Sequence, residues 1–244
     1  MAGNFVQLHN HTHYSLLDGA SKVPDLVKRV KELGMPAVGI TDHGNMHGAY
    51  ELWRAAVDSG VKPIIGIEAY VTPETARQDK TRVSWDTNWT PVPGHARNPD
   101  DVSGGGLITH LTMWAENDEG LVNLIKASSV ANLEGRVMRY PRMDKEVLST
   151  YSKGVIASSG CPSGIIQTRL RLGQFDEALR AAGEFQDIFG KDNFYIELMD
   201  HGLSIESKVT GDLLTIAKKL GAPLLATNDS HYVMEADKDA QDAM

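Results

Sequence analysis

Two pairs of side chains with metal-binding chemistry stand near opposite ends of the 244-residue chain. His9 and His11 are two residues apart, and so are Asp229 and His231. Because residues two apart in an extended segment point to the same side, each pair can present two ligands to one cation. Imidazole nitrogens and carboxylate oxygens bind zinc, and also manganese and iron. The two pairs therefore predict a metal site to which both ends of the sequence contribute.

More residues of these types border the segments that have the pattern of buried strands. Apolar runs predict strands at 5–8, 37–40, 62–67, 108–114, 155–157, 194–198 and 224–226. Because the carboxyl ends of parallel barrel strands form one face, which holds the active site, side chains at these ends should converge. The residues in question are Asp42 and His43, Glu68 at the end of the third strand, His110 near the start of the fourth, Cys161, and Asp200 with His201.

Helical periodicity occupies most stretches between the strands. It predicts a helix capped by Ser21 and closed by Gly34, helices at about 46–59, 119–133, 163–170 and 175–189, and a helix capped by Ser204 and ended by Gly221. Alternating strands and helices are the pattern of a parallel sheet with crossover helices. Seven strands in a chain of this length favour one α/β domain, with a closed barrel preferred over an open sheet.

The sequence around two of these residues, and not only their position, indicates metal binding. Glu68 ends a strand rich in Ile and Val, where a carboxylate is costly to bury unless it is paired or bound to a metal. Cys161 lies in a loop that enters a predicted helix, and a helix N-terminus favours the thiolate, the form that binds metals. Nine or so ligands exceed the capacity of one ion. The set therefore predicts two or three divalent ions that share a bridging carboxylate, zinc first and manganese or iron as alternatives.

Composition and charge narrow the class of protein. The lone cysteine excludes an intramolecular disulfide. No apolar run approaches the roughly 18 residues of a membrane helix, so we expect a cytoplasmic protein without a membrane partner. The net charge of −8 argues against a free-standing nucleic-acid binder, though not against an enzyme that acts on phosphates. Residues 73–106, which include Trp85 and Trp89, predict a long polar loop of the kind that carries function.

Several runs resemble the four motifs of the PHP (polymerase and histidinol phosphatase) domain: His9-Asn10-His11, Thr41-Asp42-His43-Gly44, Glu68, His110 and Asp229-Ser230-His231. Longer runs, such as Ser159-Gly160-Cys161-Pro162-Ser163-Gly164, resemble the PHP domain at the N-terminus of the bacterial replicative DNA polymerase III alpha subunit. The resemblance covers nearly the whole chain, and the 73–106 insertion resembles the actinobacterial type. It implies that residues 1–244 are the PHP domain in an N-terminal fragment of a longer polymerase.

This resemblance also implies a fold and a ligand set. The fold is a (β/α)7 distorted TIM-like barrel with a metal site at the carboxyl ends of the strands. Three histidines fall outside the ligand set: His13 and His47, as rim or solvated residues, and His201, which either lines the pocket or packs. The implied ligands are His9, His11, Glu68 and Asp229 for a first ion, Glu68, His110 and Cys161 for a second, and Asp18, His43 and His231 for a third.

The activity implied by the resemblance is a metal-dependent 3′–5′ exonuclease that proofreads new DNA, with a DNA 3′ end as substrate. Its partners would be the remaining polymerase domains and, through the full-length protein, replisome subunits such as the sliding clamp. Two alternatives remain open. One is a small-molecule phosphoesterase of the histidinol-phosphatase kind, and the other is a metal-stabilised structural domain that supports the polymerase.

Overall fold

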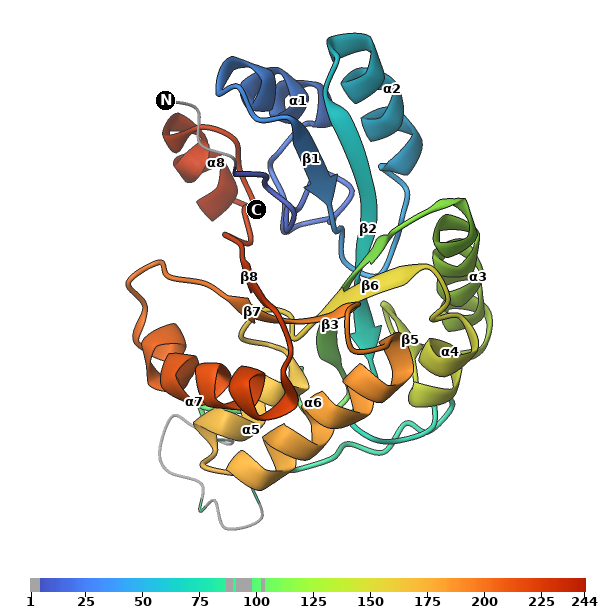
Figure 1. Cartoon of the computed structure of the whole chain (residues 1–244), viewed down its shortest axis with the longest axis vertical. Helices are drawn as coiled ribbons and strands as arrows, with labels where there is room; N and C mark the ends of the chain where they lie inside the picture. The colour runs from blue at the N-terminus through green and yellow to red at the C-terminus, as the bar shows by residue number, and fades with distance from the viewer. Residues whose placement is uncertain (1–4, 87–89, 91–97, 102–103) are drawn as a thin grey trace.

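The computed structural model describes residues 5–86, 90, 98–101 and 104–244, so parts of the predicted 73–106 loop, with Trp89, lie outside the described residues. Figure 1 shows the course of the chain. Its elements are α1 (Val23–Glu32), β1 (Ala37–Ile40), α2 (Ala49–Ser59), β2 (Lys62–Val71), β3 (Thr109–Ala115), α3 (Asp118–Glu134), β4 (Arg136–Val137), β5 (Tyr140–Met143), α4 (Lys145–Thr150), β6 (Val155–Ser158), α5 (Ile165–Arg171), α6 (Phe175–Phe189), β7 (Phe194–Leu198), α7 (Ser204–Leu220), β8 (Leu224–Ala226), a 3₁₀ turn (Glu235–Asp237) and α8 (Lys238–Asp242).

The strands form one mixed sheet in which β2 has three partners. β1 runs parallel to the first half of β2, β3 lies antiparallel to its second half, and β5 pairs with its last two residues. The remaining order is β4-β5-β2-β3-β6-β7-β8. Helices lie between most of the strands along the chain (Figure 1). The predicted α/β class is confirmed.

The N-terminal segment fills the opening between β1 and β8. Gln7 forms an isolated parallel bridge with Val38 in β1, and Asn10 forms one with Ser230 beyond β8. The predicted strand at 5–8 is thus a bridging segment and not a regular strand, in part because the Leu8 carbonyl accepts a hydrogen bond from the Trp114 indole instead of from a neighbouring strand. The fold of the described residues is therefore a distorted barrel without a continuous closed ladder.

The direction of β3 departs from the parallel arrangement predicted from the strand–helix alternation. A parallel return needs a crossover element, and the described residues between β2 and β3 include no helix. The chain therefore returns antiparallel to β2, with Val71 opposite Thr109. Because β3 runs the other way, its first residues, and not its last, lie beside the carboxyl ends of the other strands. This direction places His110 on the predicted face.

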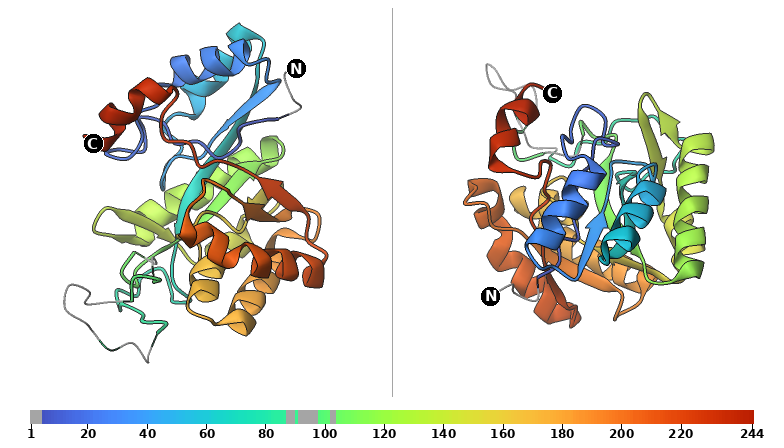
Figure 2. Two further views of the ribbon diagram at one scale, coloured as in Figure 1. Left: turned by 90° about the vertical axis from the view of Figure 1, so that its left-hand side faces the viewer. Right: turned by 90° about the horizontal axis from the view of Figure 1, so that it is seen from above.

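Two groups of buried apolar residues hold the helices against the sheet. Figures 1 and 2 show these helices around the sheet. The smaller joins α1, α2 and β1, and the larger packs α3 to α7 on β2, β3, β6 and β7. Both predicted serine caps are wrong: Lys22 and Leu203 occupy the cap positions of α1 and α7. Ser21 is instead held in a bridge with Thr12, so α1 begins later. No helix among the described residues is long and apolar enough to cross a membrane.

A short hairpin and a buried arginine organise the side of the sheet next to the 73–106 segment. The hairpin β4–β5 and helix α4 were not predicted, because elements of two to six residues are too short to show a period. Arg142 in β5 is fully buried and donates to the carbonyls of Gly135, Leu107, Arg77 and Asp79. These bonds tie the hairpin to the first part of this segment and to Leu107, the residue directly after it.

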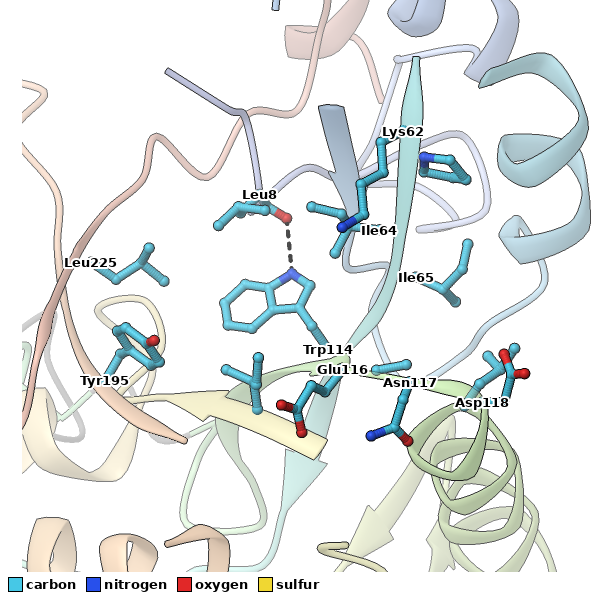
Figure 3. A pocket seen from close by; sticks show the side chains of 14 residues that line it. Leu8, Lys62, Ile64, Ile65, Trp114, Glu116, Asn117, Asp118, Tyr195 and Leu225 are labelled. Carbon is cyan, nitrogen blue, oxygen red and sulfur yellow. Dashed lines mark hydrogen bonds between the residues drawn. The ribbon is translucent and has the colours of Figure 1, made fainter. Parts of the chain in front are cut away.

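A cavity of about 510 Å³ lies at the end of the strands opposite Glu68 and His110. It is lined by the first residues of β2, the last of β3, and parts of β6, β7 and β8. Figure 3 shows Trp114 in its wall, donating from the indole N–H to the Leu8 carbonyl at 3.1 Å. The predicted ligands lie at the other end of the sheet, away from this cavity.

Candidate metal centre

All nine residues predicted as ligands lie in one cluster, in which each has a polar contact of at most 3.5 Å to another member. They come from the N-terminal segment, the loop after β1, β2, β3, the loop after β6 and the segment after β8. Residues that are far apart in the sequence therefore converge, as the positions of their strands predict.

Glu68 lies at the centre of the cluster. It stands within β2 and not at its end, because Glu68 to Val71 pair with Thr109 to Thr112. Four histidines surround the carboxylate. His9 Nε2 and His110 Nδ1 lie 3.4 and 3.3 Å from Oε1, and His11 Nε2 and His43 Nδ1 lie 3.4 and 2.7 Å from Oε2. This geometry suits a carboxylate that bridges two cations.

The distances around His9 and His11 suit side chains that share one cation. Their Nε2 atoms lie 3.3 and 3.1 Å from the same Asp229 oxygen and 3.4 Å from the two Glu68 oxygens. Ligand atoms at about 2.0–2.1 Å from a tetrahedral zinc ion are separated from one another by about 3.3–3.4 Å. The two imidazoles and the Asp229 carboxylate are therefore spaced as ligands of one ion, and Glu68 lies beside them with a different oxygen toward each histidine.

Buried atoms without hydrogen-bond partners point to the same place. Among the described residues, six such atoms belong to the cluster: His9 Nε2, His11 Nε2, His43 Nδ1, both Glu68 oxygens and Asp229 Oδ1. Buried polar groups in proteins are almost always hydrogen-bonded, so each exception needs an explanation. Cations that these atoms coordinate would supply the missing partners.

A second part of the cluster is more exposed. His43 Nε2 lies 2.6 Å from Asp18 Oδ2, and His231 Nε2 lies 3.5 Å from the same oxygen. The Asp18 side chain is 48% exposed, whereas those of His9, His11 and Glu68 are at most 1% exposed. This side of the centre therefore faces solvent, and a substrate can approach it from there.

Cys161 is buried beside His110, with 3.5 Å between Sγ and Nδ1. The expectation that a helix N-terminus favours its thiolate is wrong, because burial, and then the charges of Glu68 and Asp229, raise the pKa of the thiol well above its usual range. Helix α5 begins only at Ile165. A cation beside Sγ would supply the positive charge that deprotonates a coordinating thiol.

Three groups of side chains offer ligand atoms within 4.8 Å of one another: His9, His11 and Asp229; His43, Glu68 and His110; and His11, His43 and His231. They overlap the three expected ligand sets without reproducing them. In the second group His43 occurs with Glu68 and His110 where Cys161 was expected. In the third, His11 occurs where Asp18 was expected.

The carboxylates and histidines of the centre shift one another's proton affinities. Burial lowers the pKa of His43, but Glu68 and Asp18 outweigh it and raise that pKa to about 10. Burial likewise opposes the charges of Asp229 and Glu197, which hold the pKa of His9 well above its usual value. Burial lowers the pKa of His11 to about 4. His11 is therefore neutral near neutral pH, the form that binds metals.

Residues outside the predicted set orient these ligands. Glu197 in β7 accepts a hydrogen bond from His9 Nδ1 at 2.7 Å, which leaves Nε2 facing the centre. Ser15 accepts from His11 Nδ1 at 3.0 Å and donates to Asp42 at 2.8 Å. Such partners fix the orientation and basicity of metal-binding histidines. Glu197 was missed, although a carboxylate inside the apolar Phe194–Leu198 strand is the same signal that singled out Glu68.

One glycine shapes the turn that carries His43. Gly44 has φ of +63°, a region that favours glycine. A Cβ atom there would lie 2.8 Å from the Tyr70 ring. The ring of Tyr70 stacks at 5.8 Å on that of His43. Gly44 thus allows Tyr70 to pack beside this ligand.

Three other histidines of the described residues lie outside the cluster. His13 and His47 are exposed, as expected for rim residues. His201 was expected either to line the pocket or to pack, and both of its ring nitrogens are engaged. Nδ1 lies 2.6 Å from Glu206, and Nε2 lies 2.8 Å from the Asn228 carbonyl. The side chain of His201, 38% exposed, is therefore held by hydrogen bonds outside the cluster.

Comparisons with known proteins agree with the motifs. The PHP domain family model matches residues 7–201. The DNA polymerase III subunit alpha of Mycobacterium leprae is 53% identical over 230 residues, which are 94% of this chain and 19% of that protein. The subunit of Saccharopolyspora erythraea is 52% identical over 98% of this chain and 20% of its own length, and that of Helicobacter pylori strain J99 is 39% identical over 98% and 18%. The chain thus spans about a fifth of the length of these curated relatives.

Two solved structures share the fold. An amidohydrolase from Chromobacterium violaceum has a TM-score of 0.54 at 14% identity, over 99% of this chain and 96% of that one. A two-domain protein from Bacteroides vulgatus, containing a predicted PHP-like metal-dependent phosphoesterase, has a TM-score of 0.50 at 13% identity, over 98% of this chain and 55% of that one. At such identities the likeness concerns the fold alone.

Proposed function

Because this chain belongs to the PHP domain family, we propose that it hydrolyses phosphodiester bonds with divalent metal ions and removes nucleotides from the 3′ end of a DNA strand. The relatives named DNA polymerase III subunit alpha support this substrate, since a polymerase works at the 3′ end of the new strand. As a proofreading domain, residues 1–244 would act in the cytoplasm with the remaining polymerase domains and replisome subunits such as the sliding clamp.

The observation that carries the proposal is the convergence of six buried polar atoms in one cluster, none of which has a hydrogen bond within the protein, although His43 Nδ1 and Glu68 Oε2 lie 2.7 Å apart as an ion pair. Leaving a buried polar group without a partner costs about 1–3 kcal/mol. Six of them in one place would weaken a fold whose net stability is only about 5–15 kcal/mol. Divalent cations remove this cost, and the mixture of imidazole, carboxylate and thiol groups suits zinc, with manganese or iron as alternatives.

We propose two or three ions, with Glu68 as the shared ligand. His9, His11, Glu68 and Asp229 would hold the first ion, Glu68, His110 and Cys161 the second, and Asp18, His43 and His231 the third. Bound ions would supply an activated water near neutral pH and would neutralise the phosphate and leaving-group oxygens.

The protein's own groups prepare this chemistry. Glu197 and Ser15 hold the Nδ1 atoms of His9 and His11, so that both Nε2 atoms face the centre. The solvent-facing Asp18 marks the side from which the phosphodiester approaches. A phosphate placed there lies beside His43 and His231, which contact the same Asp18 oxygen.

The proposal is tested with His11→Ala and, as a matched control, with His13→Ala at an exposed site two residues away. Metal content, melting temperature and degradation of a 3′-labelled single-stranded oligonucleotide are measured for both variants. We expect His11→Ala to lose metal and to lower activity more than about 100-fold, beyond the cost of losing an outer-shell partner. We expect His13→Ala to match the unchanged chain, and a chelator to stop its activity.

Two results would overturn this proposal and support a different function. Hydrolysis of histidinol phosphate without degradation of the oligonucleotide would assign a small-molecule phosphoesterase. Metal-dependent melting without any chelator-sensitive hydrolysis would assign a structural role for the ions, in a domain that supports the polymerase.

A further inference from the structure

A cleft of about 610 Å³ opens beside the metal centre. Three predicted ligands, Asp18, His43 and His110, line it together with the 14–17 turn and the β4–β5 hairpin. Its volume lies within the range of about 300–1,000 Å³ that is typical of ligand sites. Whatever enters this cleft therefore lies next to the atoms proposed to bind the metals.

One wall of the cleft is aromatic. Tyr70 stacks on His43 at 5.8 Å with an interplanar angle of 15°, and Tyr140 packs edge-on against Tyr70 at 5.0 Å and 79°. The two tyrosines connect the ligand His43 to the hairpin. Unpaired bases stack on aromatic side chains irrespective of sequence, because every base has a π-face.

The hairpin also brings positive charge to a chain whose net charge is −8. Arg136 and Arg139 line the cleft, and both are exposed. The Arg139 guanidinium lies 5.2 Å from the centroid of the Tyr140 ring. Arginine and aromatic groups side by side are the combination that binds single-stranded nucleic acid, the first to phosphates and the second to bases.

The two turns that border the cleft hold exposed apolar residues in strained conformations. Leu17 has φ of +62° and Met138 has φ of +54°, and their exposed fractions are 75% and 74%. Figure 2 shows the hairpin, in yellow-green, standing out from the sheet. Residues other than glycine rarely adopt positive φ, and such strain is concentrated at ligand clamps and functional sites. Both turns therefore present an exposed apolar side chain at the edge of the cleft.

We propose that this cleft binds the unpaired nucleotides at the 3′ end of single-stranded DNA, with Arg136 and Arg139 on the phosphates and Tyr140 against a base. The identity of the strand rests on the proposed function. In this arrangement the hairpin is a binding element that holds the strand beside the metal centre. Because a base inside a duplex is already stacked and paired, the cleft favours frayed or mismatched ends over paired ones.

Binding is measured by fluorescence anisotropy with a single-stranded oligonucleotide whose last linkage is a phosphorothioate, at several salt concentrations. Each lost phosphate contact lowers the slope of log affinity against log salt by about 0.7 for single strands. The double variant Arg136→Gln/Arg139→Gln should therefore lower the slope by about 1.4, and Arg54→Gln, at an exposed position on α2, should leave it unchanged. Tyr140→Leu should weaken binding about 5- to 150-fold, and Tyr140→Phe should restore it.

Kinetics separate this inference from the proposed function. In metal-loaded protein the double arginine variant should raise KM for the oligonucleotide severalfold without lowering kcat, the pattern of lost uniform binding. Its loss of kcat/KM should be smaller for bis(p-nitrophenyl) phosphate than for the oligonucleotide, because that diester has no neighbouring nucleotides.

An unchanged salt slope and an unchanged KM in the double variant would overturn the role of the hairpin, even if the unchanged chain degrades DNA. If the unchanged chain hydrolyses neither substrate, the proposed function fails. The anisotropy slope then still decides whether the cleft binds a strand. A lower melting temperature with an unchanged slope would show that the arginines serve only the fold.

Discussion

The carboxylate of Glu197 provides a sharp test of how the centre is held together. It is fully buried. Its Oε1 atom accepts from His9 Nδ1 at 2.7 Å and from the Thr227 hydroxyl at 2.5 Å, and its Oε2 atom accepts from the Ser158 hydroxyl. Glu197→Gln keeps the shape and the bond to His9, since the Ser158 hydroxyl can turn to accept from the new amide. The substitution therefore removes chiefly one negative charge.

That charge, after the charge of Asp229, helps to hold the pKa of His9 above its usual value against the effect of burial. Removing it makes His9 a weaker base and hence a weaker ligand. Loss of such an outer partner typically weakens metal binding about 10- to 100-fold. The expected change is thus about 1.4–2.7 kcal/mol of binding free energy.

Metal affinity is measured by competition with a chromogenic chelator, and melting temperature is measured with and without metal. Glu206→Gln is the matched control, because Glu206 makes a similar 2.6 Å contact to His201 outside the cluster. We expect Glu197→Gln to lose affinity while its metal-free melting temperature stays close to that of the unchanged chain. A Glu197→Gln protein with undiminished affinity would show that the charge does not tune His9, and would refute the reasoning.

Two further predictions concern protons and the hairpin. Because the pKa of His43 is raised to about 10, it is protonated near neutral pH and must release a proton when a cation takes its nitrogen. Metal affinity should therefore rise with pH up to about that value, and the calorimetric heat of binding should depend on the ionisation enthalpy of the buffer; a heat independent of the buffer would contradict this. Arg142→Lys loses part of a set of four buried carbonyl contacts and should lower the free energy of unfolding in urea by about 2–4 kcal/mol. Arg82→Lys, an exposed arginine that contacts the Gly105 carbonyl, should change it little, and equal effects of the two substitutions would refute the role of burial.

Much of the fold was predictable because its elements are long or strongly apolar. The bounds of α6, β7 and β8 coincide with the predicted ranges 175–189, 194–198 and 224–226. The direction of β3 was not predictable, because an apolar run has the same pattern in either direction. Side-chain periodicity also cannot show that Lys22 and Leu203 precede α1 and α7 without capping them.

The convergence of the candidate ligands was predictable for a different reason. Parallel strands align their carboxyl ends, so a residue type that recurs there marks a shared face. His110 joined that face although its strand is reversed, because it stands at the start of β3. The proton affinity of Cys161 could not be predicted, because it depends on burial beside Glu68 and Asp229, which only the folded chain brings together.

Isolated β-bridges join the N-terminal segment to β1 and to the segment after β8, and this has a consequence for how the protein is made. Asn10 meets Ser230 only after nearly the whole chain has been synthesised. At about 5–20 residues per second, the ribosome needs about 10–45 s to add the residues from His9 to Asp229. For that time His9 and His11 wait without Asp229, so a complete cation site is among the last features of the domain to form. Uptake of metal would then report that synthesis and closure of the domain have finished.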